Sequence, residues 1–262
     1  MRPYFARFIA SLADKTANSR PTRFHQLLKL LDNRQSLARV YTQNIDGLEL
    51  KAGISTYHRS HGQLANDDRH YSRCVPLHGN LQYIYCQSCQ AVEEISPHLE
   101  RLMGGTFPPC TSCEREEWSR REVGKRKRTV PSMLPDVVLY GQQHPDSDGI
   151  LEFQMMDLSN DLPIDLLIVV GTGMHVIGTQ RMIREFSNHI RKNKSGDRAP
   201  CVIYLNKEFK NQKKWESIFD LWIQADCQKV AAALIRGLEG AEEFATRSHE
   251  VRYPEVLPEI YE

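Results

Sequence analysis

Four of the seven cysteines form two close pairs, and their spacing constrains the fold more than any other feature of the sequence. Cys86-x-x-Cys89 and Cys110-x-x-Cys113 are separated by twenty intervening residues. Each pair bends the backbone so that two thiolates face one ion, and two such pairs complete a tetrahedron around zinc. Because sulfur would fill all four positions, we expect one structural Zn²⁺ that is closed to water and substrate. Thioredoxin-like redox chemistry fits less well, since neither pair opens a clear strand–helix unit.

The other three cysteines stand alone, and an odd total argues against a disulfide framework. Cys201 begins an apolar strand and is interpreted as a core residue. Cys74 lies four residues before His78, so a cysteine–histidine nucleophile pair is conceivable. The neighbouring sequence offers no group that would stabilise a thiolate, and this argues against that pair.

Charge and hydropathy exclude several classes of protein. The chain has 34 basic and 33 acidic residues, so as a whole it is not a binder of polyanions. Its longest apolar run, "LLIVV" at 166–170, is far shorter than the ~20 residues of a membrane helix. The first fifteen residues lack the apolar core and cleavage site of a signal peptide. We therefore expect a soluble intracellular protein that buries a sizeable core.

Hydrophobic spacing predicts an alternation of helices and strands. "YFARFIASLAD" and "PTRFHQLLKLLDNR" have helical periods, and Pro21-Thr22 marks the start of the second helix. "LARVYTQN" is typical of a short buried strand. Later, "DLLIVVGTGMHVIG", "TQRMIREFSNHIRKN", "PCVIYLN" and "DCQKVAAALIRGLEG" alternate strand, helix, strand and helix. Continuous apolar strands in this order indicate a parallel sheet covered on both faces, so the predicted fold class is α/β, a Rossmann-like parallel sheet with a small zinc-ribbon module.

The expected domain boundaries follow from where this alternation is interrupted. Residues 1–78 form the first part of the large domain, and residues 79–135 form the small zinc-binding module with a basic loop. Residues 136–247 form the second part of the large domain, and residues 248–262 form a C-terminal tail. A polar, histidine-rich connection at 55–73 is predicted to be a surface loop.

A second candidate site lies where the predicted strands end. "IVVGTGMHVIG" has the layout of a phosphate or ribose site, although Val176 stands where a third glycine is expected, and a turn that binds nothing is an equal alternative. Asn206 ends another strand at the edge where ligands bind, and Asp226-Cys227 opens a helix beside the same crevice. His78, on a short turn, could take a proton near neutral pH, but a lone histidine is more often structural.

Taken together, the motifs resemble those of one family. "YTQNIDGLE", "LHGNL", the two CxxC pairs, "PDVVLYGQ", "IVVGTGMHV", "VIYLNK" and "ADC" occur in the order found in sirtuins, the NAD-dependent protein deacylases. The resemblance covers most of residues 1–240. "LPDVVLYGQQHP" and the long insert before His78 resemble the fungal nuclear branch that acts on histones. The resemblance implies NAD as co-substrate, one structural Zn²⁺, an acetylated protein or histone tail as partner and a nuclear location. It implies neither a membrane nor sequence-specific binding to nucleic acid.

The resemblance also assigns roles to individual residues. His78 would be the general base that activates a ribose hydroxyl of NAD. Val137 and Val138 would pair through their backbones with an extended peptide, and Tyr140 would wall the acetyl-lysine tunnel beside Gly141. Cys86, Cys89, Cys110 and Cys113 would hold the metal. The residues expected to contact NAD are Gln43, Asn44, Asp46, Gly171, Thr172, Gly173, Asn206, Lys207 and Cys227.

The sequence also departs from the family pattern. Sirtuins normally begin with a strand leading into "GAGxS" and a "GIPDFR"-like loop, and neither occurs here. "GTG" replaces the more usual "GTS", which removes a hydroxyl. We therefore expect a sheet without its first strand, an exposed strand edge and a weakened NAD site. The alternative is a truncated, catalytically impaired zinc-binding fragment that acts through protein contacts.

The basic run "RREVGKRKR" at 120–128 admits two interpretations, a nuclear-import signal or a solvated loop. A zinc-ribbon protein that binds nucleic acid would also explain this run. That third hypothesis explains neither "QNID" nor the Rossmann-like second half of the sequence.

Overall fold

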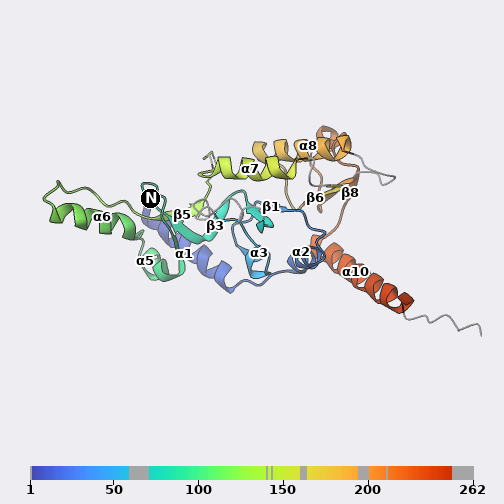
Figure 1. Ribbon diagram of the computed structural model, residues 1–262, viewed down its shortest axis with the longest axis horizontal. Coiled ribbons are helices and arrows are strands. Elements are labelled where there is room, and N and C mark those ends of the chain that lie inside the picture. The colour runs from blue at the N-terminus through green and yellow to red at the C-terminus, as the bar shows by residue number, and fades with distance from the viewer. Residues whose placement is uncertain are drawn as a thin grey trace, which may run out of the picture.

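A computed structural model of the protein describes residues 2–58, 71–139, 141–142, 144–159, 164–193, 201–210 and 212–249. The helices are α1 (Arg2–Asn18), α2 (Arg23–Asn33), α3 (Leu48–Lys51), the 3₁₀ turn η2 (Ser96–His98), α5 (Leu99–Met103), α6 (Thr111–Glu122), α7 (Ser147–Asp157), α8 (Ile177–Lys192), α9 (Gln212–Trp215) and α10 (Cys227–His249). The strands are β1 (Val40–Thr42), β2 (Cys74–Pro76), β3 (Gly79–Tyr85), β4 (Val92–Glu94), β5 (Leu134–Val137), β6 (Leu166–Val170), β7 (Cys201–Leu205) and β8 (Leu221–Ile223). Figure 1 shows their arrangement.

The fold is mixed α/β, as the sequence predicts, and its parallel strands form two sheets. Strands β1 and β2 pair in parallel, with Val40 opposite Cys74. A second parallel sheet has the order β6–β7–β8, in which Leu166 lies opposite Cys201 and Ile203 opposite Leu221. Among the described residues, no strand joins these two sheets by backbone hydrogen bonds. Helices α7 and α8 run along one side of the molecule, and α2 and α10 lie on the other (Figure 1).

One sequence expectation about this second sheet is wrong. The apolar run 166–170 predicts a strand buried on both faces, but Leu166 is 45% exposed and Ile168 is 38% exposed. Within the described residues β6 pairs with β7 alone, so it is an edge strand and part of its apolar surface remains uncovered. The sequence analysis expects an exposed strand edge without assigning it to a strand; in the described residues β6 is such an edge, and the exposure of the two side chains follows from its position.

The N-terminal helices form where the sequence predicts them. On α1, the small residues Ala6, Ala10 and Ala13 are buried together with Ile9, at helical intervals that place them on one face. Helix α2 begins directly after Thr22, whose hydroxyl and backbone N–H both face the ring of His25, three residues further on. The Thr22 side chain faces the backbone of His25, and the His25 ring accepts the backbone N–H of Thr22. The two residues thus form a capping box, with histidine in the place usually taken by Glu or Gln.

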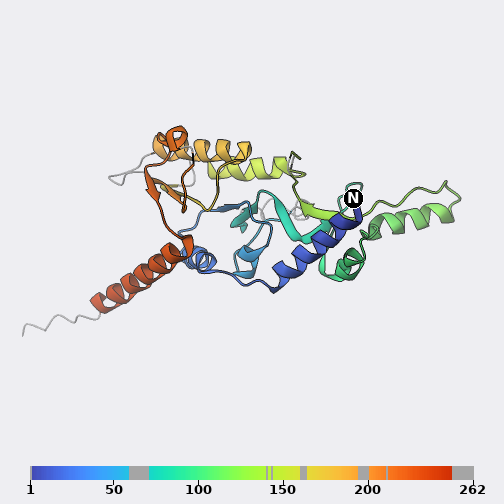
Figure 2. The same cartoon turned by 180° about the vertical axis from the view of Figure 1, so that it is seen from behind.

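The buried face of α1 packs on an antiparallel sheet with the order β4–β3–β5 (Figure 2). Leu81 and Ile84 of β3 meet α1 in a core that also contains Leu102 of α5 and Met133. Cys86 and Cys110 are buried in the same core. The cysteine cluster is therefore continuous with the apolar interior at this end of the molecule.

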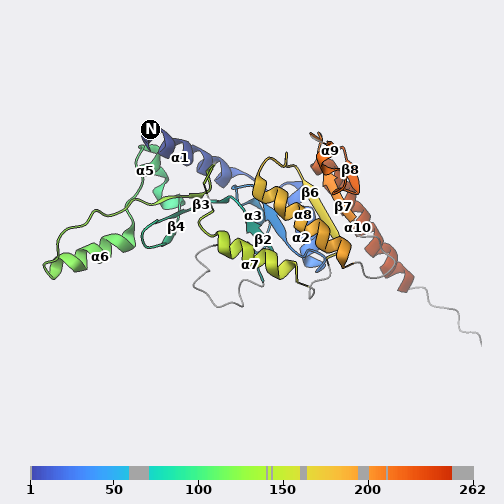
Figure 3. The same cartoon turned by 90° about the horizontal axis from the view of Figure 1, so that it is seen from above.

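A second core lies at the opposite end, around the sheet β6–β7–β8 (Figure 3). Val169 and Val202 of the strands contact Ile183 of α8, and Trp215 of α9 closes one side. The Tyr204 ring stacks on Phe219 with a centroid separation of 5.1 Å. This aromatic packing holds Tyr204 near the carboxyl end of β7, where one group of candidate ligand residues lies.

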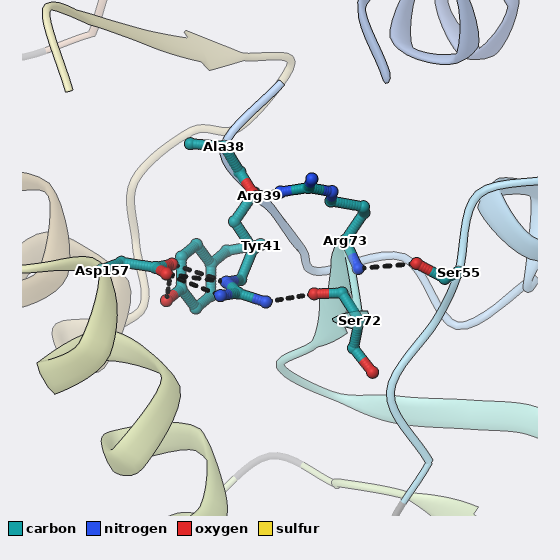
Figure 4. A network of polar contacts seen from close by, with 7 residues as sticks. All are labelled: Ala38, Arg39, Tyr41, Ser55, Ser72, Arg73 and Asp157. Carbon is teal, nitrogen blue, oxygen red and sulfur yellow. Dashed lines mark hydrogen bonds and ion pairs between the residues drawn. The ribbon is translucent and has the colours of Figure 1, made fainter. Parts of the chain in front are cut away.

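A buried polar network ties α7 to β1 (Figure 4). The Arg39 guanidinium donates to both carboxylate oxygens of Asp157, at 2.7 to 2.9 Å, and the Tyr41 hydroxyl donates to the same carboxylate at 2.7 Å. Arg39 also donates to the carbonyl of Ser72, just before β2. Burial, followed by the Asp157 charge, raises the pKa of Tyr41 far above its ordinary value. The network links β1, the segment before β2 and the end of α7.

Two predicted segments fall partly outside the described residues. The surface loop expected at 55–73 is described only at 55–58 and 71–73, where Ser55 and Arg73 are joined by hydrogen bonds. The tail expected from residue 248 overlaps the last two residues of α10, and the rest lies outside the described part. None of the helices in the described residues is both long and apolar enough to cross a lipid bilayer.

Candidate functional site

The site begins at the carboxyl end of β1, where the side chain of Gln43 bridges two segments that are distant in sequence. Its amide nitrogen donates to the Thr179 hydroxyl on α8 at 3.0 Å, and its amide oxygen accepts from the Thr172 hydroxyl at 2.8 Å. Strand β1 and the glycine turn after β6 thus face the same space, although their sheets are not joined by backbone bonds in the described residues. The amide of Gln43 holds these two strand ends together.

His78 lies in the two-residue turn between β2 and β3, half-buried beside Gln43. Its Nδ1 is 3.1 Å from the backbone carbonyl oxygen of Gln43. A carbonyl oxygen only accepts hydrogen bonds, so this bond places the proton of the neutral ring on Nδ1. Nε2 is then unprotonated, with its lone pair available. An imidazole held in this tautomer can act as a base through Nε2.

The turn that carries His78 is packed tightly against β5. A side-chain carbon on Gly79, whose φ is +82°, would lie 2.1 Å from the carbonyl oxygen of Asp136, so only glycine fits. Gly79 lies opposite Val137, and Val138 donates its N–H to the carbonyl of His78 at 2.9 Å. The predicted peptide-binding valines therefore lie beside His78. Strand β5 is an edge strand of the antiparallel sheet in the described residues.

The glycine turn after β6 holds the next group of predicted residues. Gly171 has a left-handed φ of +64°, and a side-chain carbon there would meet no atom within 4 Å. The Thr172 hydroxyl accepts from the Met174 N–H at 3.1 Å, which closes the turn before α8. Over Gly173 lies the ring of His175, with Nε2 2.6 Å from the place of a side-chain carbon. His175 thus occupies the space beside "GTG" that a residue larger than glycine would need.

Asn206 connects the end of β7 to this turn. Its side-chain amide donates to the Thr172 carbonyl at 3.3 Å and to the Tyr204 hydroxyl at 2.7 Å, and that hydroxyl itself donates to the Thr172 carbonyl at 2.9 Å. A cavity of about 250 Å³ opens here. Its lining residues are Gly173, His175, Tyr204, Asn206, Lys207, Glu208 and Lys210.

The charged groups near this cavity are paired at its rim. Lys207 Nζ lies 2.9 Å from an Asp226 carboxylate oxygen. The hydrogen bond between them raises the pKa of Lys207 and lowers the pKa of Asp226, so both remain charged near neutral pH. Asp226 also accepts the Gln228 N–H at the start of α10, next to Cys227. The pair fixes the first turn of α10 beside the end of β7.

The remaining predicted residues make only local contacts or lie outside the described part of the chain. Asn44 is exposed, and its backbone N–H donates to the Thr42 hydroxyl. Asp46 accepts the N–H of Leu48 at 3.1 Å and so supports the first turn of α3. Gly141 is exposed with a φ of +79°. Tyr140, the predicted wall of the acetyl-lysine tunnel, lies outside the described residues.

The four paired cysteines form one cluster, with all four sulfur atoms within 4.8 Å of one another. Cys86 Sγ is 3.8 Å from Cys113 Sγ, and Cys89 Sγ is 3.5 Å from Cys110 Sγ. Four sulfurs at the usual Zn–S distance of about 2.3 Å in a tetrahedron are about 3.8 Å apart, so the cluster fits zinc. Burial raises the pKa of the Cys86 thiol, but hydrogen bonds from the backbone of Cys89 and Ser88 and from the side chains of Cys110 and Cys89 together outweigh it and lower that pKa to about 7.

The other cysteines show no sign of a reactive centre. Cys74 is fully buried in β2, and burial followed by the charge of Glu49 raises its pKa well above the ordinary value. This environment disfavours the thiolate, as the sequence interpretation expects. Cys201, at the start of β7, is half-buried, and burial likewise raises its pKa.

Sequence reasoning missed three residues that complete the site. Thr179 holds Gln43, Tyr204 holds the Thr172 carbonyl, and His175 covers Gly173. Tyr204 could have been found, because it precedes Asn206 by two residues and therefore lies on the same face of the strand. Thr179 and His175 carry no comparable signal, since their contacts depend on how α8 leaves the turn.

Comparison with known proteins places these features in a family. A family model described as "Sir2 family" matches residues 2–74 and 69–178. The chain is 32% identical over 228 residues to the NAD-dependent histone deacetylase HST3 of Saccharomyces cerevisiae, covering 85% of this chain and 49% of that protein. It is 32% identical over 249 residues to the NAD-dependent protein deacetylase hst4 of Schizosaccharomyces pombe, covering 95% and 56%. The chain thus spans about half the length of these curated relatives.

Solved structures agree on the fold. A Sir2 protein bound to an acetylated peptide aligns with a TM-score of 0.59 at 19% identity, covering 87% of this chain and 74% of that one. A Sir2 complex with a p53 peptide and NAD⁺ aligns with a TM-score of 0.58 at 19% identity, covering 87% and 73%. The sequence resemblance to sirtuins, including the fungal relatives, is confirmed: the chain belongs to the Sir2 family.

Proposed function

We propose that the protein is an NAD-dependent protein-lysine deacetylase that transfers an acetyl group to ADP-ribose and releases nicotinamide. One observation carries this proposal. A continuous series of hydrogen bonds joins His78 to Gln43, Gln43 to Thr172 and Thr172 to Asn206, across the ends of β1, β6 and β7. This series connects a candidate base to the polar cavity beside Asn206. Named relatives that are NAD-dependent deacetylases support the same activity.

His78 would act as the general base. In the proposed reaction the acetyl oxygen of the substrate lysine attacks the anomeric carbon of the nicotinamide ribose, and the bond from that carbon to nicotinamide breaks. Nε2 of His78 then takes the proton of a neighbouring ribose hydroxyl, which attacks the resulting imidate carbon. Water completes the transfer, so the products are free lysine, nicotinamide and O-acetyl-ADP-ribose. The Gln43 carbonyl contributes by holding the proton on Nδ1 throughout.

The cavity near Asn206 would take the adenosine half of NAD. Asn206 and Lys207 offer side-chain donors at its rim, and Gly171, Thr172 and Gly173 bring backbone close to the ligand without bulky side chains. The left-handed Gly171 with open space around it supports this use. Cys227, at the first residue of α10, would lie near the adenine, while Gln43, Asn44 and Asp46 would face the nicotinamide and its ribose.

The acetylated peptide would add to the free edge of β5. Extended peptides that pair with an edge strand bind mainly through main-chain hydrogen bonds. Because the Val138 N–H already bonds to His78, the main-chain groups of Val137 and Gly141 are the better partners for the peptide. Val138 would still contribute, because its bond to His78 fixes the distance between peptide and base.

A histone tail is the proposed substrate, and the nucleus the proposed location. The support is the printed name of the budding-yeast relative, a histone deacetylase, at 32% identity. The four-cysteine cluster would hold zinc at a distance from the reaction as a structural ion. We also propose residues 79–135 as the zinc module, since β3, β4, α5 and α6 all lie within them.

The test is nicotinamide release by the full 262-residue chain, incubated with NAD and an acetyl-lysine peptide. We expect release to depend on both compounds and to fall by about 10²-fold or more in His78→Ala, the usual range for loss of a general base. His189→Ala, which removes a histidine from α8 outside the site, is the matched control and should retain wild-type activity. Equal nicotinamide release by the wild type and by His78→Ala would contradict the proposal that the chain is an enzyme with His78 as its base.

Impaired catalysis is the second candidate, favoured by the gap in the parallel sheet. Strands β1 and β6 are not joined by backbone bonds in the described residues, and Leu166 and Ile168 are exposed at the open edge. Under this alternative the chain would act through protein contacts. If turnover is absent, calorimetric titration with NAD identifies the cause. Heat of binding would mean that the chain binds NAD but has lost the chemistry, and no heat would mean that the nucleotide site itself is lost.

A further inference from the structure

A basic arm projects from the zinc module and has no role in the proposed deacetylation. We define this arm as residues 111–130, which comprise α6 and the segment that returns from its end. Figures 1 and 3 show α6 at one extreme of the molecule, on the far side of the module from β6, β7 and β8. The arm is thus free to meet a large partner without blocking the candidate active site.

The arm is held at its base and along its length. Backbone bonds from Cys110 to Pro131 and from Met133 to Pro108 pair the two segments that lead into and out of it. Further along, Glu117 is buried and accepts the backbone N–H of Arg128 at 2.9 Å. The segment that returns from α6 therefore lies against this helix, which holds the backbone near Arg128 in place.

Positive charge is concentrated in the outer part of the arm. Residues 118–130 contain six basic side chains and one acidic side chain, a net charge of +5. The whole chain has a net charge of +1, so the remainder carries −4. Arg121, Lys125, Arg126 and Lys127 are all exposed, and no ion pair to a carboxylate is found for them in the part of the chain that the structure describes. These four cations are available to an external partner.

We propose that this arm binds the phosphate backbone of duplex DNA without reading its sequence. Duplex DNA carries about one negative charge per 1.7 Å of helix axis, and a cation that neutralises a phosphate releases a counterion, which favours binding. Three of these four cations, Lys125, Arg126 and Lys127, are followed by the exposed Arg128, and this run of four consecutive cations at 125–128 matches the dense, uniform charge of DNA. Guanidinium groups add bidentate bonds to phosphate oxygens. Binding would require neither NAD nor an acetylated peptide and so extends beyond the proposed function.

Two observations favour duplex DNA over other acidic partners. Protein interfaces normally contain an apolar core, but within residues 111–130 the strongly exposed large apolar side chains are Trp118 and Val123, too few to form one. Single-stranded nucleic acid is normally held by several stacked aromatic side chains, and the arm has one aromatic residue, Trp118, which is 65% exposed. A cationic surface with neither feature suits a regular phosphate backbone.

The test is fluorescence anisotropy of a labelled 30-base-pair duplex with the 262-residue protein, titrated between 50 and 300 mM salt. Because log K falls with log salt by about 0.9 per neutralised phosphate, four to six contacts predict a slope near −4 to −5. Changing residues 125–128 together to alanine should reduce the slope by about 3 to 4 and weaken binding at least tenfold at low salt. A second duplex of unrelated sequence should bind equally well.

The control removes the same number of charges elsewhere. Lys15→Ala, Arg20→Ala, Lys192→Ala and Lys213→Ala in one protein alter four exposed cations outside the arm. This protein should keep most of the wild-type salt slope. Circular dichroism and one bound zinc per chain confirm that both variants fold. An unchanged slope in the 125–128 variant would overturn the proposal. So would binding of poly-glutamate as tight as that of DNA, because the arm would then recognise acidic protein.

Discussion

At the residue scale, the structure depends on buried polar groups that have partners on several elements. The side chains of Arg39 and Asp157 are 5% and 1% exposed, and the carboxylate is shared by Arg39 and Tyr41 (Figure 4). A buried ion pair adds little stability compared with apolar packing, but removal of one partner leaves an uncompensated charge in a low dielectric. The importance of the pair therefore lies in the position it imposes on β1, directly before Gln43.

Breaking this pair from one side should be costly. We expect Asp157→Asn to lower the free energy of unfolding by about 3–5 kcal/mol, because the Arg39 guanidinium is left buried without its counter-ion. The double variant Arg39→Met, Asp157→Leu should lose less than the single one, since neither charge remains. Lys210→Met, which breaks an exposed pair with Glu208, should change stability by less than about 1 kcal/mol. Urea denaturation measures all three, and a double variant less stable than Asp157→Asn would contradict the argument.

Two glycines provide a matched comparison. Gly79→Ala should cost about 1–2 kcal/mol for the left-handed backbone and about 1–3 kcal/mol more for the clash with the Asp136 carbonyl. Gly124→Ala has a similar positive φ of +73° but meets no atom within 4 Å, so it should incur the first cost alone. Chemical denaturation of the two variants gives the difference directly. Equal losses would show that the contact between β3 and β5 beside His78 is looser than its geometry implies.

At the element scale, the sequence predicted α1, α2, α8 and α10, but it missed α6 and α7 and did not predict the environment of the strands. Helix α6 is almost wholly polar, so no apolar period marks it. Thr22 and Asp226 mark the starts of α2 and α10 because a capping signal acts within one turn of the chain. The exposure of Leu166 and Ile168 depends on which strand pairs with β6, and an apolar run carries no such information. The resemblance to sirtuins assigns Gln43, His78, Thr172 and Asn206 to one NAD site, and that assignment stays a prediction. The hydrogen bonds between these residues depend on side-chain positions that no sequence motif specifies.

At the scale of the whole molecule, the candidate site lies where three sheets meet. His78 lies between the end of β2 and the start of β3, so it connects a parallel sheet to the antiparallel sheet of the zinc module. Gln43 extends the same contact to the sheet β6–β7–β8 through Thr172. The apolar cores of the zinc module and of the sheet β6–β7–β8 are separate clusters. A disturbance in the zinc module should therefore reach the site through β3 and leave the distant core intact.

Metal removal tests this division. Cys86→Ala deletes a ligand that is also part of the core between α1 and β3, so we expect loss of the single bound zinc. Structural zinc supplies roughly 10–16 kcal/mol of apparent binding energy, so its loss should unfold the module, and amides of β3 and β4 should exchange hydrogen at nearly unprotected rates. Amides of β7 should keep their protection, as should the whole protein in the control Cys201→Ala. Hydrogen exchange read by mass spectrometry distinguishes the regions. Simultaneous loss of protection in β3 and β7 would mean that the two cores unfold as one unit, and zinc retained by Cys86→Ala would remove that cysteine from the metal site.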